Sequence, residues 1–428
     1  MKKARIWKIA VAIIIVAALL PFLYDIAKYY VRAAYDARTP RPTAFPALDH
    51  PDQICLTWSG DPAITQSIQW RISPETGQTT VQYRKVSDND GDMTAPGSAL
   101  PLTDPLIENN PEIVRVTATL NDLAPSTTYE YRVGNVSADA WSDWGSFTTA
   151  PQTAPETAAE SFSFLYFGDV QIGYPTWGKL LEGATRNSPD AAFCVTAGDQ
   201  VNRGNWRDEW DRFFDAGSGF VNRRPIMPAI GNHECPGGDD PWLYLAMFAL
   251  PENGPDVIPK ERAYSFRYSN ALFVVLDSNL SASDQRPWLE QQLSTSTDTW
   301  KFVMYHHPAY SASKRRDNEE IREQWCDLFD KYHVDVAFQG HDHAYLRTPP
   351  IKAGQKVDSP ADGTIYVIAV AGDKFYDAGE FDYAAITLEN APTWQVIDIQ
   401  AGTNNKLTYQ SFGLDGNLCD EFTIEKNS

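Results

Sequence analysis

The sequence predicts three parts in order: an apolar N-terminal segment, an all-β sandwich and a layered α/β domain. An uncharged run extends from Ile9 to Tyr24. Short alternating segments then follow one another between clusters of Asp, Gly and Pro, which is typical of a β-sandwich. Beyond residue 160, apolar strands alternate with amphipathic helices, the pattern of a layered α/β domain. The expected boundaries are 1–40 for the N-terminal segment and its linker, 41–153 for the sandwich and 154–428 for the α/β domain.

The apolar run is slightly short for a membrane span and long for the core of a signal peptide. Lys8 and Asp25 at its two ends can reach the headgroups, so a span is feasible. Lys2, Lys3 and Arg5 before it favour a cytoplasmic N-terminus and an exported body. No small-x-small cleavage site follows directly. We therefore expect a membrane anchor with the rest of the chain outside the cytoplasm, or a secreted protein if the segment is cleaved.

Composition narrows the class of protein. The net charge of −20 disfavours a nucleic-acid-binding surface. The five cysteines show no C-x-x-C spacing, so the chain is not a disulfide scaffold, although one bridge remains open. Cys194 lies in an apolar strand and Cys326 on a predicted helix, so both are expected to be buried thiols.

The sandwich is predicted from strands at 53–58, 67–71, 80–83 and 114–120. The segment 123–134 resembles the late strand of a fibronectin type III domain, and 144–151 resembles its closing strand. Tyr129 stands just after a Leu-x-Pro turn, where its hydroxyl can hydrogen-bond back to the turn and fix the corner. No site chemistry is evident here, so a structural role is expected; a protein partner is not identifiable.

The α/β domain is predicted from alternating strand and helix patterns. Strands are expected over 162–167, 191–197, 225–230, 263–268, 271–277, 301–305, 334–338 and 364–371, and helices over 177–186, 206–216, 285–293 and 319–332. Trp206 and Trp210 fall four residues apart, which places them on one face of their helix. The insertion 235–262, rich in Pro and Gly, is expected to form part of a site rim.

Five short blocks at predicted strand ends hold five of the seven histidines. The blocks are Gly168-Asp169-Val170-Gln171, Gly198-Asp199, Gly231-Asn232-His233-Glu234, His306-His307-Pro308 and Gly340-His341-Asp342-His343. Strand ends are where open α/β sheets bind ligands. Carboxylate, carboxamide and imidazole together suit a pair of first-row transition metals better than Ca²⁺ or Mg²⁺. Two such ions side by side promote displacement at phosphorus, so the blocks predict a phosphoester hydrolase.

The order of these blocks resembles the calcineurin-like metallophosphoesterase superfamily, and within it most closely the purple acid phosphatases. The resemblance runs from about residue 45 to the C-terminus. Its most specific segments are 340–347, with Pro350 shortly after, and 231–234. A preceding fibronectin-like domain is found in the plant-type members. The resemblance implies an N-terminal domain of that kind followed by a four-layer αββα metallophosphoesterase domain.

The resemblance also implies a binuclear metal site of Fe, Zn or Mn ions acting on a small phosphorylated substrate. The implied ligands of metal one are Asp169, Asp199 as a bridge and His343, and those of metal two are Asp199, Asn232, His306 and His341. If their segment is extended, His341 and His343 project from the same side. A hydroxide held between the ions would hydrolyse phosphate monoesters, as in acid phosphatases. His233 would contact the phosphate or protonate the leaving group.

Two positions depart from the purple acid phosphatase pattern. Asn202 replaces the tyrosine whose phenolate binds Fe³⁺ and gives the colour, and Gln171 stands where that family has glycine and many superfamily members have a histidine ligand. We hypothesise that Gln171 supplies the missing ligand through its amide oxygen, with Asn202 the weaker candidate. The alternative for Gln171 is a loop residue bonded to the backbone. Without the phenolate, Zn²⁺, Mn²⁺ or Fe²⁺ becomes suitable, and a colourless enzyme is predicted.

Three further residues are candidates for substrate contact: His307, Tyr345 and Arg347. Their alternatives are structural, since His307 adjoins a ligand and the other two could hold the histidine loop in place. Two other functions stay open. One is a phosphodiesterase or nucleotide pyrophosphatase on the same site. The other is a non-catalytic surface binding protein whose metal domain is a relic.

Overall fold

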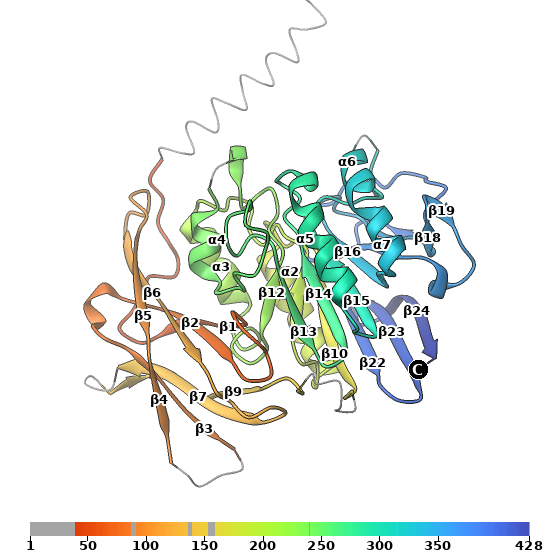
Figure 1. Ribbon diagram of the computed structural model, residues 1–428. Coiled ribbons are helices and arrows are strands. Elements are labelled where there is room, and N and C mark those ends of the chain that lie inside the picture. Colours follow the sequence, from red (N-terminus) through yellow and green to blue (C-terminus); the bar gives the residue numbers. More distant parts are fainter. Residues whose placement is uncertain are drawn as a thin grey trace, which may run out of the picture.

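The computed structural model describes residues 39–86, 91–135, 139–152, 159–238, 240–314 and 316–427 (Figure 1). Residues 1–38, which include the predicted anchor and nearly all of its linker, lie outside this range. Within the described range, no helix combines the length and the apolar character that crossing a bilayer requires. From residue 39 onward the chain builds a β-sandwich and then a larger α/β body, which lie side by side (Figure 1).

The N-terminal domain consists of two antiparallel sheets, as predicted. One has the order β1 (Asp52–Thr57), β2 (Gln66–Ile72), β6 (Glu112–Leu120), β5 (Ser98–Thr103), and the other β4 (Met93–Pro96), β3 (Thr80–Lys85), β7 (Thr128–Asn135), β8 (Ala140–Trp141), with β9 (Gly145–Thr148) also on β7. Their inward side chains, Trp70 and Tyr131 among them, form a core of their own. The Ala124 N–H donates to the Tyr129 hydroxyl at 2.9 Å, so the predicted tyrosine corner is confirmed.

The α/β body contains two facing sheets. The first has the order β12 (Ile226–Pro228), β11 (Cys194–Thr196), β10 (Phe162–Phe167), β22 (Thr393–Gln400), β23 (Asn404–Gly413), β24 (Leu418–Asn427). The second has the order β13 (Tyr264–Tyr268), β14 (Ala271–Val275), β15 (Trp300–Met304), β16 (Val336–Gln339), β20 (Ile365–Ile368), β17 (Tyr345–Arg347), β21 (Ile386–Leu388). The Phe164 ring joins the sheets, with its centroid 5.1 Å from that of Phe273 and 5.2 Å from that of Phe302.

Helices cover the outer faces of both sheets, which gives the four layers that the resemblance implied (Figure 1). Helices α2 (Tyr174–Asn187) and α3 (Arg207–Ala216) pack on the first sheet, where Trp177 contacts Phe167 of β10 at a centroid distance of 4.8 Å. Helices α5 (Ala282–Thr295) and α7 (Asp327–Tyr332) share a second core with β14 and β15.

Several elements differ from their predicted form. The expected helix 319–332 is divided into α6 (Glu319–Ile321), a π-helical turn η3 (Arg322–Cys326) and α7. The short elements β18 (Ile351–Lys352), β19 (Gln355–Lys356), α4 (Trp242–Met247), η1 (Pro74–Thr76), η2 (Pro236–Gly238) and η4 (Pro360–Asp362) were not predicted. All five cysteines lie in the described range and none is bridged; Cys194 and Cys326 are buried, as expected.

Helix α3 of the α/β body packs against the sandwich and so links the two domains. Its Asp211 is fully buried and accepts hydrogen bonds from Arg71 Nη1 at 2.8 Å, Gln53 Nε2 at 2.8 Å and Thr43 Oγ1 at 2.9 Å. Trp58 of the sandwich adds an apolar contact, because it is buried and lies in the same core as β10 and β11. The sandwich and the α/β body are therefore joined by buried charge and by shared core.

Replacing Arg71 with alanine is expected to destabilise the protein by about 3–5 kcal/mol, because Asp211 then stays buried without its cation. Denaturant-induced unfolding measures this change. The control is Arg84→Ala, which removes an exposed pair with Glu130 and should have little effect. Equal losses in the two variants would contradict the importance of the buried pair.

Candidate metal centre

Strand ends from both sheets meet at one edge of the α/β body. In the first sheet β10, β11 and β12 run parallel and lead into Asp169, Asp199 and Asn232. In the second sheet β15 and β16 run parallel and lead into the two remaining blocks. Asp169 also forms a parallel bridge with Val370, which follows β20 of the second sheet. The carboxyl ends of the two sheets therefore lie against each other, as the sequence predicted.

The close approach of these loops requires unusual backbone. Gly198 has φ of 94°, and a Cβ atom on Gly340 would lie 2.2 Å from Asp169 Oδ1, so neither position accommodates a side chain. His341 and His343 have φ of 74° and 49°. The extended segment expected for these histidines is therefore wrong, because both residues adopt the left-handed conformation. Such strain in residues other than glycine is concentrated at functional sites.

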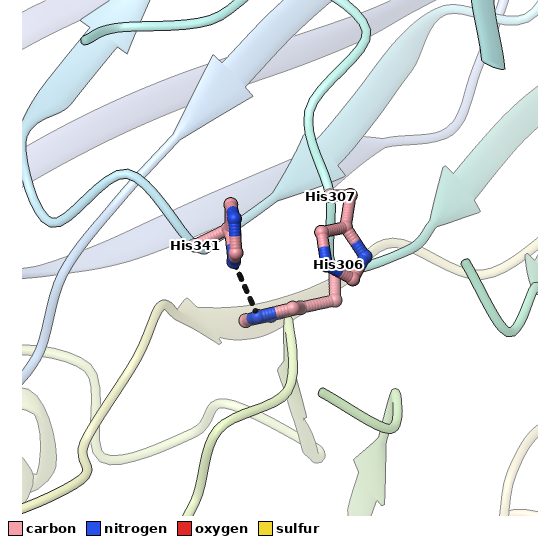
Figure 2. Close-up of side chains that lie close together, drawn as sticks. All are labelled: His306, His307 and His341. Atoms are coloured by element: carbon pink, nitrogen blue, oxygen red, sulfur yellow. Dashed lines mark hydrogen bonds between the residues drawn. The ribbon is translucent and has the colours of Figure 1, made fainter. Parts of the chain in front are cut away.

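Four ligand atoms converge in the group expected to hold metal two. His306 Nε2 lies 3.0 Å from Asn232 Oδ1, 3.1 Å from His341 Nδ1 and 3.2 Å from Asp199 Oδ2. His306 Nδ1 donates to the Ala197 carbonyl at 2.8 Å, which directs the other ring nitrogen into this group (Figure 2). Atoms carrying lone pairs at these distances repel unless a proton or a cation lies among them. The donor set therefore fits a metal ion.

The group expected to hold metal one fits as well. Asp169 Oδ1 accepts from the His341 N–H at 2.8 Å, whereas its Oδ2 is buried without a hydrogen-bond partner. His343 Nε2 faces that oxygen at 3.3 Å. The other ring nitrogen of His343 donates to the Lys374 carbonyl at 2.9 Å, the usual orientation of a metal-binding histidine. A cation would satisfy the orphaned carboxylate oxygen.

The pKa values of the three candidate histidine ligands show which of them are neutral and so free to bind a metal ion. Burial lowers the pKa of His343 to about 3 and holds the pKa of His341 well below its ordinary value, so both imidazoles are neutral. Burial acts in the same direction on His306, but the carboxylates of Asp199 and Asp169 outweigh it and raise the pKa of His306 to about 10. Without metal the cluster therefore retains a proton, which a metal ion would displace.

Two buried glutamates hold the ligand loops. Glu234 accepts hydrogen bonds from three backbone N–H groups, those of Asp199, Gly231 and Val201, at 2.8, 2.8 and 3.2 Å. On α3, Glu209 accepts from Asn202 and Arg203 N–H at 2.8 and 2.9 Å. The loop after Asp199 is thus fixed from both sides.

His233 lies beside the ligands without joining them. Its backbone N–H donates to Asp199 Oδ1 at 2.9 Å, and its Nδ1 donates to the Asn202 carbonyl at 2.6 Å. Its Nε2 lies 3.9 Å from Asp199 Oδ2, so it points toward the site. The side chain keeps 25% of its surface exposed.

Gln171 enters the site in a different orientation from the one predicted. Its Nε2 donates to Asp199 Oδ2 at 2.6 Å, and its Oε1 accepts from Lys374 Nζ at 3.1 Å. The amide oxygen therefore faces Lys374 and not the ligand group. Asn202 serves the site through its main chain, since its N–H is held by Glu209 and its carbonyl orients His233.

Of the three candidates for substrate contact, only His307 lies at the site. Its ring lies beside that of His341 (Figure 2), at a centroid distance of 4.3 Å. Its Nδ1 shares a 2.9 Å hydrogen bond with Ser278 Oγ. Tyr345 and Arg347 require a correction. The Tyr345 hydroxyl donates to Asp420 Oδ2 at 2.7 Å.

Arg347 donates to both oxygens of Asp420, at 2.6 and 2.8 Å. Tyr345 and Arg347 therefore anchor the histidine loop to β24, because their polar atoms are committed to this buried carboxylate. This is the structural alternative that the sequence left open for them.

A cavity of about 650 Å³ adjoins the metal centre at Asn232 and His307. Cys235 and Gly237 of the insertion contribute to its lining, as predicted. Sequence reasoning missed Lys374, whose carbonyl orients His343 and whose side chain meets Gln171. Its position just after β20, a parallel strand beside β16, was the signal that could have found it.

Comparisons with known proteins agree with this geometry. The chain matches the purple acid phosphatase N-terminal domain over 51–149 and the calcineurin-like phosphoesterase family over 162–345. An uncharacterized protein of Mycobacterium tuberculosis is 26% identical over 298 residues, which cover 59% of this chain and 54% of that protein. Purple acid phosphatase 15 of Arabidopsis thaliana is 27% identical over 273 residues, which cover 55% of this chain and 49% of that protein. The chain thus spans about half the length of these relatives.

The purple acid phosphatase PPD1 from yellow lupin (Lupinus luteus) seeds has a similar structure. The TM-score is 0.76 at 18% identity, and the match covers 90% of this chain and 75% of that one. At this identity the likeness establishes the shared fold. The calcineurin-like match, 162–345, contains all six expected metal ligands. The chain is therefore similar to the calcineurin-like phosphoesterases over 162–345, and in front of that domain it is similar to the N-terminal domain of the purple acid phosphatases over 51–149.

Proposed function

We propose that this protein hydrolyses phosphate monoesters with a pair of Fe, Zn or Mn ions, as acid phosphatases do. The observation that carries the proposal is the convergence of oxygen and nitrogen lone pairs on His306 Nε2, together with the orphaned Oδ2 of Asp169. Carboxylate, carboxamide and imidazole ligands suit transition metals. Ions bound there would neutralise phosphate charge and activate water for attack on phosphorus.

We assign the exchange of a proton with the substrate to His233. Its Nδ1–H is committed to the Asn202 carbonyl, so any further proton is carried on Nε2, the atom that points toward the site. A bound phosphate dianion favours that protonated form. From there the proton can pass to the departing alcohol oxygen, which is the role of a general acid.

Removing the metal ions is expected to abolish hydrolysis. Chelation with EDTA or the variant His341→Ala should lower turnover of p-nitrophenyl phosphate by more than about 100-fold, since even the outer partners of metal ligands are commonly worth 10- to 100-fold. Metal analysis of the purified protein accompanies the assay. The control is His50→Ala, because His50 is exposed and lies outside the site.

Full activity in both the stripped protein and His341→Ala would refute the metal mechanism. A substrate panel then separates related activities: p-nitrophenyl phosphate, its bis-ester and nucleotides report a phosphatase, a phosphodiesterase or a pyrophosphatase. A purified protein that binds no metal under loading conditions would instead fit a non-catalytic relic.

The iron-loaded protein is expected to be colourless, because Asn202 offers no phenolate to Fe³⁺ where purple acid phosphatases have tyrosine. Visible absorption spectroscopy tests this. The variant Asn202→Tyr should gain a charge-transfer band if its phenolate reaches the ion. A strong visible band in the unmodified protein would contradict the prediction.

We further propose that the protein is exported and held at the membrane by its first 40 residues. The basic residues before the uncharged run from Ile9 to Tyr24 support this orientation. The full chain is expected to sediment with membranes and to resist alkaline extraction, whereas a chain beginning at residue 41 should not. Equal partitioning of the two forms would rule out the anchor.

A further inference from the structure

The side chain of Lys374 is folded toward the metal centre with few partners. Its ammonium donates to Gln171 Oε1 at 3.1 Å and lies 5.3 Å from the centroid of the Tyr376 ring. Among the described residues, no carboxylate forms an ion pair with it. An ammonium has three N–H donors, and the contact with Gln171 uses one. Two donors therefore remain for a ligand at the edge of the site.

Neighbouring contacts keep this lysine in place. Gln171 is itself fixed, because its Nε2 donates to the Asp199 carboxylate at 2.6 Å. The Tyr376 ring packs against the His343 ring at a centroid distance of 4.9 Å. The Lys374 carbonyl holds the same histidine. Ordering a lysine side chain carries an entropic cost, and here the order directs the charge toward the group expected to hold metal one.

Arg316, another cation near the candidate ligands, differs because it is already paired with a carboxylate. Its Nε donates to Asp342 Oδ1 at 2.8 Å and its Nη2 donates to the His341 carbonyl at 3.0 Å. Arg316 therefore supports the histidine loop, whereas Lys374 forms no ion pair with a carboxylate in the described chain and acts on Asp169 only from beyond ion-pair distance. Both cations lie near the ring of Tyr376, but only Arg316 is paired with a carboxylate.

Resting on the proposed function, we propose that Lys374 binds an unesterified phosphate oxygen and so favours monoesters over diesters. A phosphate monoester dianion has three unesterified oxygens, whereas a diester has two and carries one negative charge. With a monoester, the oxygen that meets Lys374 carries charge and accepts a charge-assisted hydrogen bond. With a diester, a second organic group competes for that position. Lys374 would thus be a specificity-determining residue.

The test uses the metal-loaded full chain and the variant Lys374→Met, which keeps the length of the side chain and its packing on Tyr376. Calorimetric affinity for inorganic phosphate is expected to fall about tenfold, the usual scale of a hydrogen bond to a charged group. The ratio of kcat/KM for p-nitrophenyl phosphate to that for its bis-ester should fall as well. Lys374→Arg should restore part of both. Lys356→Met, on the exposed hairpin β18–β19, is the matched control.

Unchanged phosphate affinity in Lys374→Met would overturn the proposal. Loss of bound metal in that variant would also overturn it, because Lys374 would then support the ligands and not the substrate. If the unmodified protein binds metal and phosphate but hydrolyses neither ester, the proposed function fails. The role of Lys374 is then decided by phosphate affinity alone, so the two failures are distinguishable.

Discussion

Electrostatic repulsion among the candidate ligand atoms is the constraint that the surrounding loops must satisfy. The oxygen and nitrogen atoms expected to bind metal lie 3.0 to 3.3 Å from one another, and few protons are available to separate them. The backbone that holds them there is itself strained, with left-handed conformations at Asp199, His341 and His343. Such an arrangement is stable only when the surrounding structure over-determines it and when positive charge fills its centre.

The surrounding structure meets this requirement with buried acceptors that hold backbone, not metal. Glu234 accepts three N–H groups from two ligand loops, and Glu209 accepts two more from the loop that follows Asp199. Burial and the neighbouring Asp199 raise the pKa of Glu234 to about 8. Burying this carboxyl group costs free energy. Its hydrogen bonds to backbone N–H groups offset that cost and fix the loops that carry the candidate ligands.

That the candidate ligands lie close together could be predicted from the sequence, because each of them stands at the end of a predicted strand. Asp169 stands two residues beyond β10 and Asp199 three residues beyond β11, so the position of each carboxylate follows from the strand before it. The orientation of Gln171 could not be predicted, since it depends on Lys374, 203 residues further along the chain.

Other failures have the same origin in distant contacts. Tyr345 and Arg347 look like substrate contacts until Asp420 on β24 is placed beside them. The left-handed backbone of the two histidines was hidden as well, because it arises from crowding between loops and not from local propensity. The division of the helix after Glu319 by a π-helical turn likewise has no local signature that we recognise.

Helix α3 links the sandwich to the candidate metal centre. Roughly opposite faces of one short helix serve both halves of the molecule: Glu209 accepts hydrogen bonds from the loop beside the candidate ligands, and Asp211 is buried against the sandwich. Because α3 is bonded on both sides, a shift of the sandwich against Asp211 would also move Glu209. That movement would displace the Asn202 loop, whose carbonyl orients His233. The N-terminal domain therefore supports the candidate site and is more than a detachable adaptor. A fusion of the N-terminal domain to another hydrolase domain would therefore have to include helix α3.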